Sequence, residues 1–219
     1  MVVYYRVAFR SKTMTKSQKL SVVRALHMPT LADAMLDSPM KSSAGKTALT
    51  KAALVVFGTL LLAMSAQFKI PLYPVPITGQ TLVVLLIGMT FGARLGGITM
   101  AAYLFEGALG LPVFAGGASG IATLIGPTGG YLFGFLLASV AMGYLAERGM
   151  GRTAVSTVAA MIIGNCVIYV CGALWLSNFI GFGQAIGAGV LPFLYGDTLK
   201  LIIAAGIMPL AWRAVKTTK

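Results

Sequence analysis

The stretch LPFLYGDTLKLIIAAGIMPLAW, residues 191–212, decides the fold class of this chain. It is apolar along most of its length and close to the roughly 20 residues that a helix needs to cross a lipid bilayer. Its charged residues are Asp197 and Lys200, three positions apart. A charge inside a bilayer costs about 2.5–3.5 kcal/mol on insertion scales. An acid and a base kept in such a segment therefore point to a function.

The composition of the whole chain supports a membrane protein. Hydrophobic residues make up 58% of it and charged residues 10%, whereas soluble domains carry about 25% charged residues. The net charge is +12, but many of the lysines and arginines precede Ala52 and the rest stand singly between apolar runs. This distribution follows the positive-inside rule. Because it forms no basic patch with stacking aromatics, we expect no nucleic-acid partner.

Six apolar segments follow a polar, basic tail. We expect residues 1–45 to form that tail, partly disordered or amphipathic, with a short helix in MPTLADAMLDSP that lies on the membrane surface. Residues 46–219 are expected to form one membrane domain. The sequence GARLGG connects the second and third segments, which are short, and predicts a tight helical hairpin. The segments cover about 48–66, 79–93, 95–110, 129–147, 153–176 and 196–213.

The basic residues also predict an orientation. If the N-terminus is cytoplasmic, the connections that carry Arg94 and the pair Arg148 and Arg152 are inside, as is the basic C-terminal tail. The first outer connection then carries Lys69, and the other two outer connections carry no charge. We therefore predict an all-α membrane protein with six transmembrane helices and both termini in the cytoplasm.

The three outer connections are unlike ordinary polar loops. Residues 67–78, 111–128 and 177–195 are long, apolar, and rich in glycine and proline. Left in water, such loops would expose apolar side chains and unpaired backbone groups. We expect them to fold back as structured caps over a ligand cavity. An uncharged cap of this kind suits a small ligand of mixed polarity.

Enzyme motifs are incomplete. GASG at 117–120 resembles the serine motif of intramembrane proteases, but His27, the histidine of this chain, lies in the polar tail, and serine chemistry needs a base beside the nucleophile. AGKT at 44–47 resembles the end of a phosphate-binding loop, but Met40 stands where the motif requires glycine. The cysteines have no histidine near them that could complete a zinc site. The sequence predicts no enzyme, no cofactor and no metal.

The residues Asp197 and Lys200 are the strongest candidates for a site. Residues at i and i+3 share a helix face, so the two side chains are expected to touch. Two structural alternatives stay open: a simple ion pair at a helix mouth, and an acid in the first helical turn that complements the helix dipole. Neither alternative explains why a charged pair lies under three apolar caps.

Other polar side chains inside or beside the apolar segments are also candidates. Glu106 either pairs with a neighbouring helix or lines the cavity. Asn165 and Tyr169 share a helix face, and hydrogen bonding between helices is the alternative for Asn165. Tyr131 begins a segment, where a tyrosine of the membrane-interface belt would also lie. Gln80 completes the set of neutral polar candidates.

Several separated motifs, in order, resemble the BioY family of biotin transporters. They are IPLYPVPITGQTLVVLLIG, GARLG, ALGLPVFAGG, GPTGGYLFGF and LPFLYGDTLK, and the resemblance spans about residues 50–213. It implies a six-helix substrate-binding S component of an energy-coupling factor transporter. Such a protein binds biotin from outside the bacterial cytoplasmic membrane. Another small vitamin on the same scaffold is the alternative ligand.

The resemblance also implies partners. An S component works with a coupling transmembrane protein and two ATPase subunits, although some family members occur without that module. Ala48 and Ala52, spaced four apart in the first segment, are the expected contact with the coupling protein, because small residues let helices approach closely. Alanines without any partner contact would give the same spacing in a membrane helix.

For the ligand, the resemblance suggests a division of roles. Asp197 accepts bonds from the ureido N–H groups of biotin, and Lys200 holds Asp197 ionised and donates to a ligand oxygen. Asn165 and Gln80 supply amide contacts, while Tyr131 and Tyr169 pack against the rings. Some relatives carry a cation beside the tyrosine of the GGY motif, where this chain has Leu132. Loop amides, Lys200 or water are therefore the expected partners of the ligand carboxylate.

Overall fold

The computed structural model describes residues 28–36 and 44–217. The described chain is mostly helical. Its helices are α3 (Leu31–Leu36), α4 (Ala44–Gln67), α5 (Gln80–Ala108), α6 (Ile121–Ile125), α7 (Gly129–Ala146), α8 (Ala154–Ile180), α9 (Phe182–Gly189) and α10 (Leu191–Thr217), with a 3-10 turn, η1, at Ala115–Gly117. The strands are β1 (Lys69–Ile70) and β2 (Ile77–Thr78).

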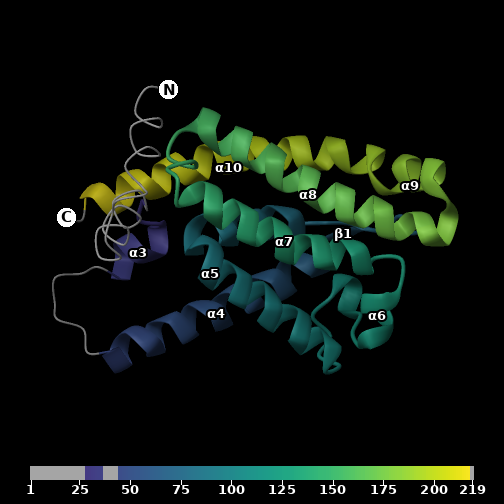
Figure 1. Ribbon diagram of the computed structural model, residues 1–219, viewed down its shortest axis with the longest axis horizontal. Coiled ribbons are helices and arrows are strands. Elements are labelled where there is room, and N and C mark those ends of the chain that lie inside the picture. The colour runs from purple at the N-terminus through teal and green to yellow at the C-terminus, as the bar shows by residue number, and fades with distance from the viewer. Residues whose placement is uncertain (1–27, 37–43, 218–219) are drawn as a thin grey trace, which may run out of the picture.

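Five helical runs in the described residues are long and apolar enough to cross a membrane. They are α4, α5, α7, α8 and the run from α9 into α10. Figure 1 shows the long helices running side by side along the length of the molecule. The protein is therefore a multi-pass membrane protein.

The helix α5 is folded back on itself at Gly92. This residue has φ 83° and ψ 172°, a non-helical conformation that favours glycine. A Cβ built on Gly96 would lie 3.1 Å from the Cα of Gly88, whereas residues eight apart in a straight helix are about 12 Å apart. The two arms of α5 thus lie against each other, and the reversal falls in the GARLGG sequence where a hairpin is expected.

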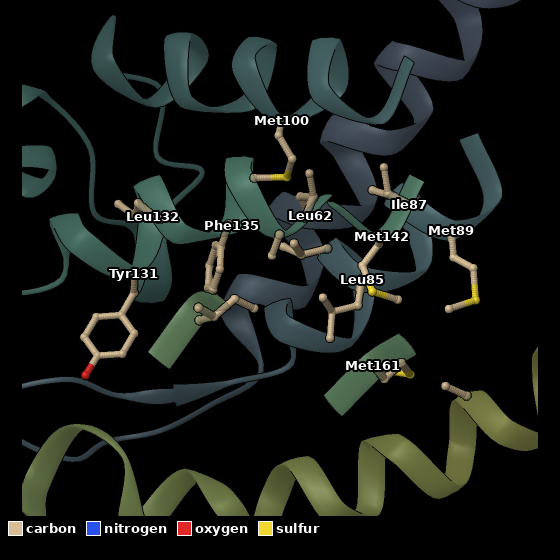
Figure 2. Packing of buried hydrophobic residues seen from close by; sticks show 14 of the residues in the cluster. Leu62, Leu85, Ile87, Met89, Met100, Tyr131, Leu132, Phe135, Met142 and Met161 are labelled. Atoms are coloured by element: carbon tan, nitrogen blue, oxygen red, sulfur yellow. The ribbon is translucent and has the colours of Figure 1, made fainter. Parts of the chain in front are cut away.

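The turn at Gly92 is held by α7. A Cβ on Gly143 would overlap the backbone of Ala93 and Gly92, so the two segments touch through bare backbone. Glu147, just after α7, accepts a hydrogen bond on Oε1 from the backbone N–H of Ala93, at 2.8 Å. Figure 2 shows the buried side chains of α4, α5, α7 and α8 that pack around this framework, among them Leu62, Leu85, Met100, Phe135, Met142 and Met161.

Replacing Gly143 by valine should destabilise the fold. The side chain would have to displace the backbone of the α5 turn, and overpacking of this kind costs about 1–3 kcal/mol or more. Thermal unfolding in detergent measures the effect. Gly206 is the matched control, because it lies in α10 with nothing within 4 Å of a built Cβ. Equal melting temperatures for Gly143→Val and Gly206→Val would contradict the close approach.

The N-terminal helix α3 packs against α5 and α10. Thr30 and Asp33 bond reciprocally at its start: Thr30 Oγ1 donates to Asp33 Oδ2 at 2.8 Å and accepts from the Asp33 N–H at 3.2 Å. Leu31 is buried in the core, and the Met28 N–H donates to the carbonyl of Glu147. Residues 31–36 thus lie on the helix bundle. The expectations for residues 1–27 and 37–43 fall outside the described residues.

The three long connections meet at one end of the molecule, away from α3 (Figure 1). The first carries the antiparallel ribbon of β1 and β2, with Lys69 opposite Thr78 and Ile70 opposite Ile77. Strands were not expected, so the all-α prediction is wrong for these few residues, because the proline-rich sequence between them reverses the chain and lets its ends pair. The second connection carries η1 and α6, and the third carries α9.

Candidate functional site

A cavity of about 170 Å³ lies beside the connections at this end of the molecule. Its walls come from α5, α7, α8, α10 and the first two connections. Much of its lining is apolar or aromatic, and hydroxyl groups and one amide supply the rest. The lining residues are Val75, Pro76, Thr78, Gln80, Thr81, Phe114, Ala115, Ala118, Thr123, Thr128, Tyr131, Leu132, Phe135, Ile168, Tyr169 and Phe193. Such a lining suits a small ligand of mixed polarity.

The residue Asp197 lies deeper in its helix than the sequence suggests. The helix α10 begins at Leu191, not near residue 196, so Asp197 is more than one turn inside it and the first turn holds no acid. Pro192 is compatible with this start, since the first turn of a helix needs no backbone donor there. The helix-dipole explanation for Asp197 is therefore wrong. Asp197 is 3% exposed, so it is also not an ion pair at an open helix mouth.

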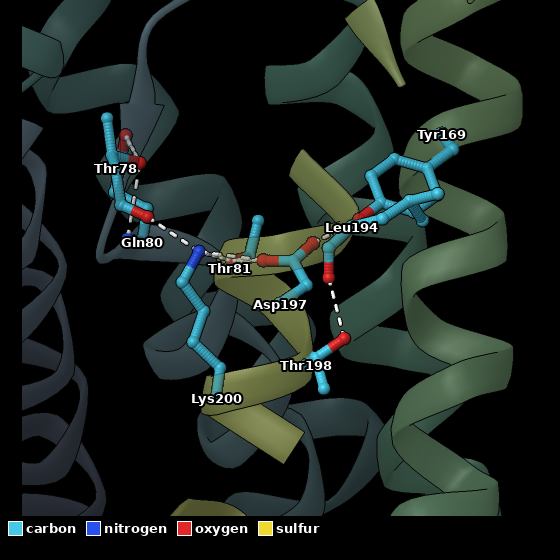
Figure 3. Close-up of polar contacts among 8 residues, drawn as sticks. All are labelled: Thr78, Gln80, Thr81, Tyr169, Leu194, Asp197, Thr198 and Lys200. Atoms are coloured by element: carbon cyan, nitrogen blue, oxygen red, sulfur yellow. Dashed lines mark hydrogen bonds and ion pairs between the residues drawn. The ribbon is translucent and has the colours of Figure 1, made fainter. Parts of the chain in front are cut away.

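The amine of Lys200 is held by three acceptors. Its Nζ lies 2.7 Å from Asp197 Oδ1, 2.8 Å from the carbonyl oxygen of Thr78 and 2.6 Å from Thr81 Oγ1. An ammonium group has three N–H donors, so each has a partner. Figure 3 shows the side chain reaching from α10 to the start of α5. Lys200 thus ties α10 to β2 and α5 as well as neutralising the buried carboxylate.

Both oxygens of Asp197 accept hydrogen bonds. Thr81 donates from its Oγ1 to Oδ1 at 3.0 Å, and the hydroxyl of Tyr169 on α8 donates to Oδ2 (Figure 3). We call Asp197, Lys200, Thr81 and Tyr169 the charged cluster. Thr81 and Tyr169 also line the cavity, whereas Asp197 and Lys200 are not among the lining residues, so the ion pair adjoins the cavity through these two hydroxyl groups. A buried ion pair is costly unless it is hydrogen-bonded in this way.

A second chain of hydrogen bonds starts from Gln80. Its Nε2 donates to Tyr103 Oη at 2.7 Å, and that hydroxyl donates to the carbonyl of Val113 at 2.7 Å. Thr78 Oγ1 donates to Gln80 Oε1 at 3.2 Å. Gln80 therefore links the first connection to the second, while it also lines the cavity.

The residue Tyr131 is buried at the start of α7. Its hydroxyl donates to the carbonyl of Gly189 at 2.7 Å, and its ring stacks on Phe193 with centroids 6.0 Å apart. At 5% exposure and facing the cavity, it is not a tyrosine of the membrane-interface belt. It fixes α9 and α10 against α7 and presents an aromatic face to the cavity.

Four predicted site residues are not among those that line the cavity: Asp197, Lys200, Asn165 and Glu106. Asn165 is buried one helical turn from Tyr169, and within the described part of the chain its Oδ1 accepts no hydrogen bond. Glu106 is half-buried in the second arm of α5. The two expected partner-contact residues, Ala48 and Ala52, are exposed on α4. Within residues 28–36 and 44–217, no three His, Cys, Asp or Glu side chains gather as a metal site.

The sequence interpretation missed several residues of the site. Thr81 touches both members of the ion pair. It directly follows Gln80, and a hydroxyl group at the start of an apolar helix is the sequence signal that could have identified it. The aromatic rings of Phe114 and Phe193 line the cavity, but phenylalanine in a membrane segment is usually core or lipid contact. Threonines 78, 123 and 128 lie in connections, where they carry no distinguishing pattern.

Together, the helices and the cavity define a multi-pass membrane protein with a small, mostly apolar site. A family model described as the BioY family matches residues 37–217. The chain therefore belongs to the BioY family.

Named relatives agree with this assignment. A probable biotin transporter BioY from Pyrococcus horikoshii is 40% identical, over 69% of this chain and 89% of the relative. The biotin transporter BioY of Thermotoga maritima is 39% identical, over 67% of this chain and 86% of the relative. A crystal structure described as the S-component for biotin from an ECF-type ABC transporter has a TM-score of 0.70 and 25% identity, and covers 78% of this chain and 95% of that one.

Proposed function

We propose that this protein binds biotin and takes it up across the cytoplasmic membrane, as the S component of an energy-coupling factor transporter. The observation that carries the proposal is the charged cluster, whose members Thr81 and Tyr169 line a mostly apolar cavity and bond the buried Asp197 directly behind it. The names of the relatives and of the similar structure point to the same ligand.

The chemistry of biotin matches the cavity. Its ureido ring offers two N–H donors and one carbonyl acceptor, and its thiophane ring and alkyl chain are apolar. The ureido group would lie at the charged cluster, where Asp197 provides a carboxylate and Tyr169 and Thr81 provide hydroxyl groups. The hydrocarbon part would pack against aromatic side chains such as Tyr131 and Phe193. Gln80 lines the cavity as a neutral amide, and Asn165 provides a buried, unused acceptor behind Tyr169.

The proposed topology has six spans and two cytoplasmic termini. The reversal at Gly92 supports it, because each arm of α5 can then cross part of the bilayer. Arg94 follows the Gly92 reversal by two residues, and Arg148 and Arg152 lie between α7 and α8. An orientation with these arginines inside would follow the positive-inside rule. The capped end would then face outward. Residues 1–45 would be a tail, and residues 46–219 the membrane domain.

Uptake needs an energy source from outside this chain. In the proposed assembly a coupling transmembrane protein would dock on α4, where Ala48 and Ala52 are exposed, and two ATPase subunits would drive reorientation. Glu106 would then serve the packing of the outer end of α5. Solitary biotin transport without the ATPase module is the second possibility. In either case the protein carries biotin without altering it and is not an enzyme.

Purified protein without any partner should bind labelled biotin saturably and release it unchanged. Unlabelled biotin should compete, whereas thiamine and riboflavin should not. Equilibrium binding in detergent or nanodiscs, followed by mass analysis of the released ligand, makes the measurement. Competition by another vitamin at lower concentration would favour a different ligand on this scaffold, and a chemically changed ligand would contradict the transport proposal.

A further inference from the structure

The proposed function leaves the carboxylate of biotin without a partner. Lys200 is poorly suited to this role, because its three donors are already engaged by Asp197, Thr78 and Thr81. Leu132, at the position beside the GGY tyrosine, lines the cavity but carries no charge. A cationic partner for the carboxylate, as distinct from loop amides or water, would therefore come from another element at this end of the molecule.

The residue Lys69 is placed on the cavity side of the ribbon. In the register of β1 and β2, Lys69 lies directly opposite Thr78. Side chains of directly opposed residues in an antiparallel pair point to the same face. Thr78 lines the cavity, so Lys69 leaves the ribbon on that face.

The end of the Lys69 side chain lies over the second connection. A Cβ built on Gly116 would overlap the Nζ of Lys69, so the amine rests against bare backbone at this glycine. Gly116 has φ 69°, a conformation that favours glycine. Ala115, directly before it, and Ala118, two residues after it, line the cavity. The ammonium group is thus at the cavity rim, where two connections meet.

The ammonium group of Lys69 is also not paired with any acidic residue that the structure describes. No carboxylate in the described ranges forms an ion pair with it, and its residue is exposed. An unpaired cation on a flexible stem at a cavity rim can close onto an anion that emerges from the cavity.

We propose that Lys69 binds the free carboxylate of the ligand and makes the site selective for the free acid over its amides and esters. This inference rests on the proposed function. The ureido end would lie at the charged cluster, and the carboxylate at the opposite rim, under Lys69. Amide-linked forms of the vitamin would lose this ion pair and bind more weakly.

The test compares two ligands across variants. Biotin and its primary amide, biotinamide, are titrated against the wild type, Lys69→Gln, Lys69→Arg and the control Lys51→Gln, whose lysine is exposed on α4. We expect Lys69→Gln to weaken biotin about tenfold, the size of one charge-assisted bond, and to leave biotinamide within about twofold. Lys69→Arg should retain the preference for biotin, and Lys51→Gln should change neither ligand.

The outcomes separate the two proposals. If Lys69→Gln weakens both ligands equally, or neither, the inference is overturned while biotin binding by the wild type still supports the proposed function. If the wild type binds no biotin, the proposed function fails and the inference with it.

Higher salt should reduce the preference for biotin over biotinamide in the wild type and not in Lys69→Gln, because screening acts on the ion pair.

Discussion

Replacing Asp197 by asparagine should weaken biotin binding by about 1–3 kcal/mol, the range for a buried polar group left without its partner. The variant keeps the shape of the side chain but removes the charge that Lys200 neutralises and that Tyr169 and Thr81 bond. The asparagine amide would place N–H donors against Lys200, Thr81 and Tyr169, which all donate to the carboxylate in the wild type. Equilibrium binding of labelled biotin measures the loss, with thermal unfolding as the check that the variant folds.

Glu106→Gln is the matched control for Asp197→Asn. Both variants remove one acid from a membrane helix at the end that carries the long connections. Glu106, however, is neither a member of the charged cluster nor among the cavity-lining residues, so the affinity of Glu106→Gln for biotin should stay within about twofold of the wild type. The double variant Asp197→Asn, Lys200→Gln should lose less than the sum of the single losses, since the two groups are coupled. Wild-type affinity in a folded Asp197→Asn variant would remove Asp197 from the site.

Filling the cavity should abolish binding. Ala118 lies in the second connection, lines the cavity and has an extended backbone, with φ −63° and ψ 155°, that any residue can adopt. An indole ring at this position would occupy the space that the ligand needs. We expect Ala118→Trp to show no saturable biotin binding in the concentration range where the wild type is saturated.

Ala122→Trp separates occupancy of the cavity from disturbance of the connection. Ala122 lies four residues further on, in α6, where it is exposed and is not among the lining residues. The same change there should leave biotin affinity near that of the wild type. If both variants bind biotin normally, the cavity is not the binding site; if both lose binding, the connection is sensitive as a whole.

Much of the fold could be predicted because lipid imposes simple rules. The apolar segments predicted the long helices, and the glycines of GARLGG predicted the reversal at Gly92, which needs a positive φ. The start of α10 could not be predicted. Residues 191–195 are apolar and include Pro192, a composition that suits a capping loop and the first turn of a helix equally well.

Contacts within the site were predictable only between residues that are close in sequence. The contact between Asp197 and Lys200 follows from their spacing on one helix, and the structure confirms it. Thr81 bonds Asp197 from 116 positions away, and no local pattern reports such a contact. The position of Lys69 depends on the register of a two-residue ribbon, which a proline-rich sequence does not reveal.

The most direct test of the account is a structure of the protein with biotin bound. We predict ligand density in the cavity lined by Thr81, Tyr131 and Tyr169, with the ureido ring at the charged cluster and the carboxylate toward Lys69. Biotin bound outside this cavity, or inside it with the charged cluster turned away from the ligand, would contradict the account.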